Sequence, residues 1–151
     1  MKYPMLPEKI SALIDGEPDP IANLANVSAL LMQELPCINW VGFYLYHEQA
    51  QELVLGPFQG KVACVRIRPG RGVCGTAFSQ NRSVRVDNVH DFPGHIACDE
   101  ASNAELVIPL RDAQGRPMGV LDLDSTVFSR FSAEEQTELE TAAHLIEQTI
   151  F

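Results

Sequence analysis

Apolar positions recur at helical spacing in two segments, one near the start of the chain and one at its end. In the first segment, residues three or four apart form a single stripe: Ile21, Leu24, Ser28, Leu31 and Leu35. Pro20 suits the first turn of this helix, and Pro36 ends it. In the last segment, Ser132 and Glu135 have the spacing of a capping box. The apolar stripe that follows it consists of Leu139, Ala142, Ala143, Ile146 and Ile150.

Between these two helices, short apolar runs and turn residues predict a sheet. The aromatic and β-branched run from Trp40 to His47 and a second run beginning at Leu53 indicate a β-hairpin. We expect further strands at Val62 to Ile67, Val84 to Val86, Glu105 to Leu110 and Met118 to Asp124, with a turn at Asp112–Gly115 and a short helix at Thr76–Gln80. The prediction is an α+β domain with a central, mostly antiparallel sheet of about five or six strands between N- and C-terminal helices.

Length and charge narrow the possible classes of protein. A chain of 151 residues that is 46% hydrophobic predicts a single domain spanning residues 1–151. A net charge of −9 argues against nucleic acid as a partner, since binding to phosphates requires a basic surface. No segment approaches the roughly 18 apolar residues of a membrane span, and no leader is evident, so we expect a cytoplasmic protein. The apolar stripes of the two terminal helices make a homodimer a further expectation.

The four cysteines indicate thiol chemistry rather than a metal site. Cys37, Cys64, Cys74 and Cys98 include no Cys-x-x-Cys pair, so we expect no bound metal, although His90 and His95 lie near Cys98 in the sequence. Cys98 lies in a polar loop next to acidic residues, as expected for an exposed, activated thiol. Cys64 or Cys74 could resolve an oxidised Cys98. Cys37 lacks polar neighbours and is predicted to be buried and inert.

Alternation along the last predicted strand places two carboxylates on one surface. Leu121 and Leu123 face one side, while Asp122 and Asp124 face the other. Glu105 begins the preceding strand and can join them if the register allows. Clustered carboxyls raise the pKa of at least one member, which could then donate a proton, while the others bind an ammonium group. The alternative is that these acids merely form the solvated face of a half-exposed strand.

The segment Gly70–Gly75 matches Gly-x-Gly-x-x-Gly, but the domain lacks the parallel βαβ unit that a dinucleotide site requires. Its glycines could instead let backbone N–H groups approach a small anion, and a helix start there would favour the thiolate of Cys74. A plain tight loop is the alternative. Trp40, the only tryptophan, fits either the core or the wall of a ligand pocket.

Several motifs together resemble one family. The resemblance spans about Ala22 to Phe131 and is carried by Asn39–Leu45, Leu55–Cys64, Gly70–Thr76, Gly94–Asp99 and Gly119–Ser125. These segments look like those of the free methionine-(R)-sulfoxide reductases, which are GAF-domain enzymes.

The resemblance implies a GAF-like domain and an oxidoreductase that reduces the R epimer of free methionine sulfoxide. It implies that Cys98 is the nucleophile, that Cys64 resolves it through a disulfide, and that Cys74 is a third cysteine of less certain role. The substrate pocket would contain Glu105, Asp122, Asp124 and Trp40. No bound cofactor is expected, and thioredoxin or a similar external dithiol would reopen the disulfide.

Two other functions stay open at this point. A non-catalytic GAF module would bind a small metabolite and report it to a partner. A cysteine redox sensor would use the Cys64–Cys98 disulfide itself as the signal. Oxidation of Cys98 that depends on substrate would distinguish the enzyme from both.

Overall fold

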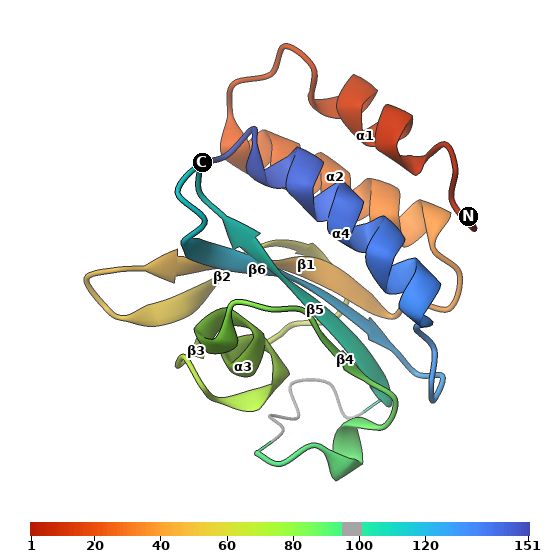
Figure 1. Cartoon of the computed structure of the whole chain (residues 1–151), viewed down its shortest axis with the longest axis vertical. Coiled ribbons are helices and arrows are strands. Elements are labelled where there is room, and N and C mark those ends of the chain that lie inside the picture. The colour runs from red at the N-terminus through yellow and green to blue at the C-terminus, as the bar shows by residue number, and fades with distance from the viewer. Residues whose placement is uncertain (95–100) are drawn as a thin grey trace.

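The computed structural model describes residues 1–94 and 101–151 of the chain. Within these residues, a six-stranded sheet has helices α1, α2 and α4 on one side and α3 on the other (Figure 1). The strand order is β3-β2-β1-β6-β5-β4. In chain order the elements are α1 (Leu6–Ile14), α2 (Pro20–Glu34), β1 (Trp40–His47), β2 (Glu52–Gln59), β3 (Arg66–Ile67), α3 (Gly72–Gln80), β4 (Val84–Val86), a 3₁₀ turn (Val89–Asp91), β5 (Ala104–Arg111), β6 (Pro117–Ser125) and α4 (Ala133–Glu147).

The sheet confirms the predicted α+β class, because every pair of neighbouring strands runs antiparallel. The predicted turn between the last two long strands is also confirmed. One carboxylate oxygen of Asp112 accepts hydrogen bonds from the N–H groups of Gln114 and Arg116. Gly115 has φ +81°, a conformation that costs glycine little.

Side-chain alternation divides the interior into two cores, one on each face of the sheet. On β6, the fully buried Leu121 and Leu123 belong to the core beneath the three large helices. Val120 of the same strand belongs to a second core, which includes Ala77 and Phe78 of α3. Each fully buried leucine contributes roughly 1.5–3 kcal/mol. The sheet is therefore covered on both faces, and its α3 side is where the polar residues of β6 point.

Helix α2 follows the prediction closely. The side chain of Asp19 accepts a hydrogen bond from the N–H of Ala22 at 3.0 Å, and Pro20 is the first helical residue. The helix ends one residue before Leu35, ahead of Pro36. Ile21 was predicted to belong to the buried stripe, but its side chain in the first turn is 67% exposed. The buried stripe starts instead at Leu24.

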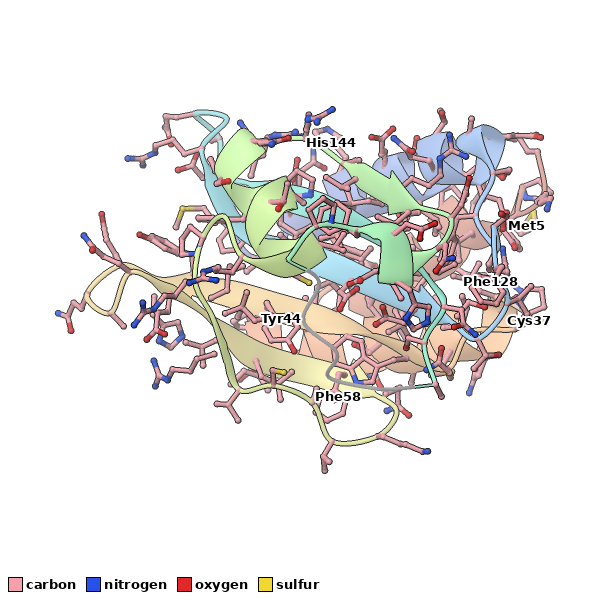
Figure 2. The ribbon with its side chains drawn as sticks, turned by 90° about the horizontal axis from the view of Figure 1, so that it is seen from below. Met5, Cys37, Tyr44, Phe58, Phe128 and His144 are labelled. Carbon is pink, nitrogen blue, oxygen red and sulfur yellow. The ribbon has the colours of Figure 1, made fainter. Side chains whose placement is uncertain are left out.

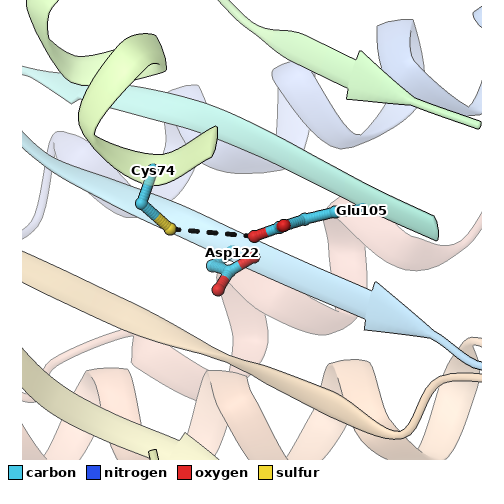
Figure 3. Close-up of side chains that lie close together, drawn as sticks. All are labelled: Cys74, Glu105 and Asp122. Atoms are coloured by element: carbon cyan, nitrogen blue, oxygen red, sulfur yellow. Dashed lines mark hydrogen bonds between the residues drawn. The ribbon is translucent and has the colours of Figure 1, made fainter. Parts of the chain in front are cut away.

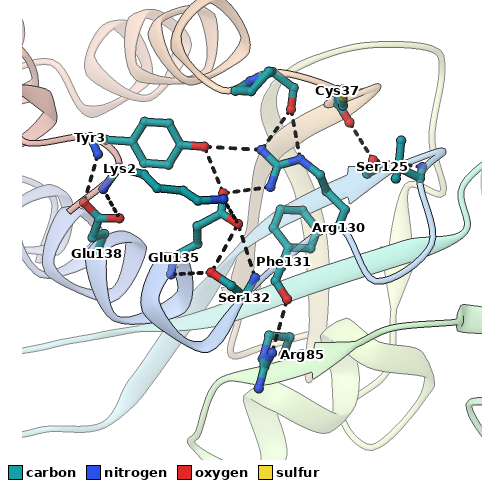
Figure 4. Close-up of polar contacts among 12 residues, drawn as sticks. Lys2, Tyr3, Cys37, Arg85, Ser125, Arg130, Phe131, Ser132, Glu135 and Glu138 are labelled. Carbon is teal, nitrogen blue, oxygen red and sulfur yellow. Dashed lines mark hydrogen bonds and ion pairs between the residues drawn. The ribbon is translucent and has the colours of Figure 1, made fainter.

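Helix α4 begins at the predicted capping box, and its first turn is the centre of a polar network (Figure 4). Arg130 Nη1 lies 2.7 Å from Glu135, which also accepts a hydrogen bond from the Tyr3 hydroxyl at 2.8 Å. Burial raises the pKa of Glu135, but these hydrogen bonds outweigh it and lower the pKa to about 2. The network fastens the N-terminal segment to α4.

Helix α1 was not predicted, although its buried residues Leu6, Ile10 and Ile14 repeat every four positions. It packs on α2 and α4, outside the layer that touches the sheet (Figure 1). No helix among the described residues is long and apolar enough to span a membrane.

Two local predictions are wrong. The strand expected at Val62 to Ile67 is reduced to β3, because the carbonyls of Lys61 and Cys64 accept hydrogen bonds from side chains of β1 instead of a neighbouring strand. Cys64 therefore lies in an irregular segment and not within a strand. Cys37 is exposed rather than buried: it adopts φ +59° in the turn after α2 and lies at the edge of the molecule in Figure 2.

Candidate functional site

The three acids predicted to share a surface do lie together on the α3 side of the sheet. Glu105 of β5 is directly opposite Asp124 of β6, and Asp122 lies two residues before Asp124 on the same face. All three line one pocket, in which Glu105 and Asp122 are each only 6% exposed. This burial excludes the alternative that the three acids merely form the solvated face of a half-exposed strand.

Cys74 closes the pocket from above. It comes from the first turn of α3, and its thiol donates to Oε2 of Glu105 at 3.9 Å (Figure 3). Oδ1 of Asp122 is buried without a hydrogen-bond partner among the described residues. A buried acceptor without a donor is costly, so this oxygen is suited to receive a donor from a ligand.

Burial dominates the electrostatics of this cluster. It raises the pKa of Glu105 well above its ordinary value, and the charges of Asp122 and Asp124 raise it further. Burial also raises the pKa of Asp122, while hydrogen bonds from its polar neighbours partly oppose the shift. The predicted elevated carboxyl pKa is thus confirmed. The cluster therefore keeps a proton at a pH where an exposed carboxyl has lost it.

The expectation of a thiolate at Cys74 is wrong. Although Cys74 lies at the start of a helix, burial and the neighbouring carboxylates of Asp122 and Glu105 raise its pKa well above the usual value. Burial and local negative charge therefore have a larger effect on the pKa of Cys74 than the helix terminus has. Cys74 is therefore a neutral thiol that donates a hydrogen bond.

The helix start itself faces the pocket and is longer than predicted. Helix α3 begins at Gly72 instead of Thr76, and both Gly72 and Val73 line the pocket. The preceding residue, Arg71, makes no side-chain capping hydrogen bond. A Cβ on Gly75 would lie 2.4 Å from the carbonyl oxygen of Arg68, so this glycine of the motif serves close packing. The N-terminal end of α3 can attract a carboxylate.

Aromatic residues of β1 form the opposite wall. Trp40 is 3% exposed, stacks on Phe58 with ring centroids 5.1 Å apart, and also lines the pocket, so it is both core and wall. Tyr44, whose importance the sequence did not reveal, lies near the centre of the sheet (Figure 2). Its hydroxyl donates to the carbonyl of Cys64 at 2.9 Å, and the Trp40 indole N–H donates to that of Lys61 at 3.1 Å.

The described cysteines differ in their redox state. Cys64 is disulfide-bonded, whereas Cys37 and Cys74 are free thiols. The segment that carries Cys64 borders the pocket through Val62 and Ala63. Cys98, the predicted nucleophile, and its neighbour His95 lie outside the described residues.

The pocket also contains a set of possible metal donors, against the expectation of no metal site. One donor atom each from Cys74, Glu105 and Asp122 lies within 4.8 Å of the others. Metal ligation requires deprotonated groups, however, and burial keeps the proton on Cys74 and Glu105. A metal ion there would have to displace both protons, whereas a ligand that donates and accepts hydrogen bonds would not.

Comparison with known proteins places the chain in a family. The GAF domain family model matches residues 22–150. The chain is 51% identical over 148 residues to the free methionine-R-sulfoxide reductase of Escherichia coli K12, covering 98% of this chain and 88% of the relative. The chain belongs to the GAF-domain family of free methionine-R-sulfoxide reductases.

Other members of this reductase family agree in sequence and structure. The Saccharomyces cerevisiae enzyme is 40% identical over 142 residues, covering 91% of this chain and 79% of the relative. The X-ray structure of the Neisseria meningitidis enzyme in complex with its substrate is 42% identical. It has a TM-score of 0.92 and covers 98% of this chain and 87% of that one. The predicted GAF-like fold is thus confirmed, and the pocket lies where its α3 covers the sheet.

Proposed function

We propose that the protein reduces free L-methionine-(R)-sulfoxide to methionine, with Cys98 as the nucleophile and Cys64 as the resolving thiol. The observation that carries the proposal is the buried acid cluster, which retains a proton beside a segment that bears a disulfide-bonded cysteine. Membership of the reductase family supports the substrate class.

The first step combines attack by the Cys98 thiolate with proton donation by Glu105. The thiolate of Cys98 attacks the sulfoxide sulfur, and Glu105 donates a proton to the sulfoxide oxygen as the sulfur–oxygen bond breaks. A second proton lets this oxygen leave as water, and Cys98 is then bonded to the methionine sulfur. Water attacks the sulfur of Cys98 and the sulfur–sulfur bond breaks, so the products are methionine, a sulfenic acid on Cys98 and a released proton. The sulfoxide sulfur is reduced by two electrons and the cysteine sulfur is oxidised by two.

The second step resolves the sulfenic acid. The thiol of Cys64 attacks the sulfenic sulfur, forms a disulfide and releases water. An external dithiol such as thioredoxin then reduces this disulfide by exchange and is itself oxidised. Cys64 itself lies in irregular backbone between β2 and β3, where side chains of β1 hold the carbonyls of Lys61 and Cys64.

Selectivity for the free amino acid follows from the two ends of the pocket. The ammonium group can bind Asp124 and the unpartnered Oδ1 of Asp122, while the carboxylate can bind the N-terminal end of α3 at Gly72 and Val73. Trp40 offers an apolar surface to the methyl group. A peptide-bound methionine sulfoxide lacks both charges, and the unpaired groups it would leave cost several kcal/mol.

The test is methionine release from free R-sulfoxide, free S-sulfoxide and a peptide-bound sulfoxide, with thioredoxin as reductant. Wild type should reduce only the free R epimer, Cys98→Ser should be inactive, and Cys64→Ser should stop after about one turnover. Cys37→Ser is the matched control, because Cys37 is a free thiol outside the pocket. An inert wild type would refute the proposal. Oxidation of Cys64 without any substrate turnover would favour a redox sensor.

A further inference from the structure

Positive charge is concentrated in one short segment of an acidic chain. Residues 60–71 contain Lys61, Arg66, Arg68 and Arg71, and no acidic residue. The whole chain has 20 acidic and 11 basic residues and a net charge of −9, so this segment is opposite in sign to the rest. We call it the 60–71 segment. It also carries Cys64.

The charged side chains of the 60–71 segment are exposed, and two aliphatic ones are exposed among them. Val62 and Val65, two residues before and one after Cys64, are 87% and 59% exposed. Arg66 lies 3.8 Å from Glu52, a partly buried acid of β2, so its charge is partly balanced. Exposed apolar side chains rimmed by like charges are typical of a protein interaction site.

The position of Cys64 indicates what must approach this surface. In the proposed cycle, the disulfide at Cys64 has to be reduced by a thiol from outside the chain. A small thiol needs only the sulfur. A dithiol protein also has to place its own surface against the residues that flank Cys64, and these are basic and aliphatic.

We infer that the 60–71 segment is the docking surface for an acidic dithiol protein that reduces the disulfide at Cys64. This inference rests on the proposed function. Val65 contacts the apolar rim of the partner's active site, and Lys61 and Arg68 attract its negative charge. The partner thiolate attacks the disulfide to form a mixed disulfide. Its second thiol then releases the reduced enzyme, so two electrons pass from partner to enzyme.

The experiment compares reductants of different size and charge on the same variants. Lys61→Glu/Arg68→Glu reverses two exposed charges, and Val65→Ser removes one aliphatic contact. Arg82→Glu/Arg116→Glu is the control, since both arginines are exposed, outside the segment, and give the same change in net charge. Methionine production is measured with a thioredoxin of net negative charge, with neutral dithiothreitol and with glutathione, a small anionic thiol.

The inference predicts that the KM for thioredoxin rises about tenfold in Lys61→Glu/Arg68→Glu and severalfold in Val65→Ser. Rates with dithiothreitol and the KM for the sulfoxide should match wild type, and the control should match wild type throughout. An unchanged KM for thioredoxin overturns the inference. So does an equal loss with glutathione, which would reveal general anion attraction. Failure of wild type to turn over with dithiothreitol would instead refute the proposed function.

Discussion

Replacing Tyr44 by phenylalanine isolates one hydrogen bond that positions the proposed resolving cysteine. Tyr44 is 2% exposed, and its hydroxyl donates to the carbonyl of Cys64 at 2.9 Å. The ring lies 6.0 Å from that of Trp40 and remains in the variant. Tyr44→Phe therefore removes the anchor of Cys64 while leaving the wall of the pocket in place.

The expected size of the effect follows from the number of such anchors. Besides Tyr44, the indole N–H of Trp40 and the backbone N–H of Leu55 bind carbonyls of this segment, at Lys61 and Val65. Removing one of the three costs about 1 kcal/mol, a factor of about five in the fraction of Cys64 held in position. The same loss should lower the melting temperature by only about 2–4 °C.

The assay is a single turnover without reductant. Reduced enzyme is mixed with excess R-sulfoxide, and quenched samples are analysed for methionine and, by alkylation and mass spectrometry, for disulfide. Tyr44→Phe should lower the ratio of disulfide-formation rate to methionine-release rate about fivefold. Tyr46→Phe is the control, because Tyr46 is on the same face of β1 but stacks on Phe78, 4.7 Å between centroids. An unchanged ratio in Tyr44→Phe, or an equal fall in Tyr46→Phe, would refute the reasoning.

Three further substitutions test the energetics of the fold. The folded state raises the pKa of Glu105 from 4.5, so wild type loses stability as the pH rises above that value. Glu105→Gln should therefore flatten the dependence of melting temperature on pH. Parallel plots of melting temperature against pH for the two proteins would contradict this. In Gly42→Ala the new Cβ would lie 2.3 Å from that of Phe58. The free energy of unfolding measured in urea should therefore fall by about 2 kcal/mol. An unchanged midpoint of the urea unfolding transition would argue against the packing described. Glu135→Gln leaves the partly buried Arg130 without its charged partner and should cost about 3 kcal/mol at neutral pH. This loss of stability should shrink below pH 4.5 and disappear near the folded pKa of about 2. A loss that is the same at every pH would disprove the role of the charge.

The parts of the fold that sequence predicted well are those set by local periodicity. Burial of one face produces a periodic pattern within a short stretch of sequence. Such local patterns predicted the stripe from Leu24 to Leu31, the capping box of α4 and the alternation around Asp122. The three acids were found in the same way. Only their register, with Glu105 opposite Asp124, required the structure.

Two of the errors involve contacts between residues far apart in the chain. The segment around Cys64 has the composition of a strand. Side-chain hydrogen bonds from Trp40 and Tyr44, about 20 positions earlier, take the place of the backbone hydrogen bonds to a neighbouring strand. Cys74 begins a helix, yet carboxylates from β5 and β6 raise the pKa of its thiol instead of lowering it. Sequence spacing predicts neither effect, because each depends on which side chains the sheet brings together.

Trapping the sulfenic acid of Cys98 shows whether the substrate itself oxidises this cysteine. The reduced Cys64→Ser variant, which cannot resolve the intermediate, is mixed with each epimer of free methionine sulfoxide and with dimedone, and the modified cysteine is located by mass spectrometry. We expect a dimedone adduct on Cys98 with the R epimer alone, formed in step with methionine. No adduct, an adduct on Cys74 instead, or equal labelling by the S epimer would contradict it.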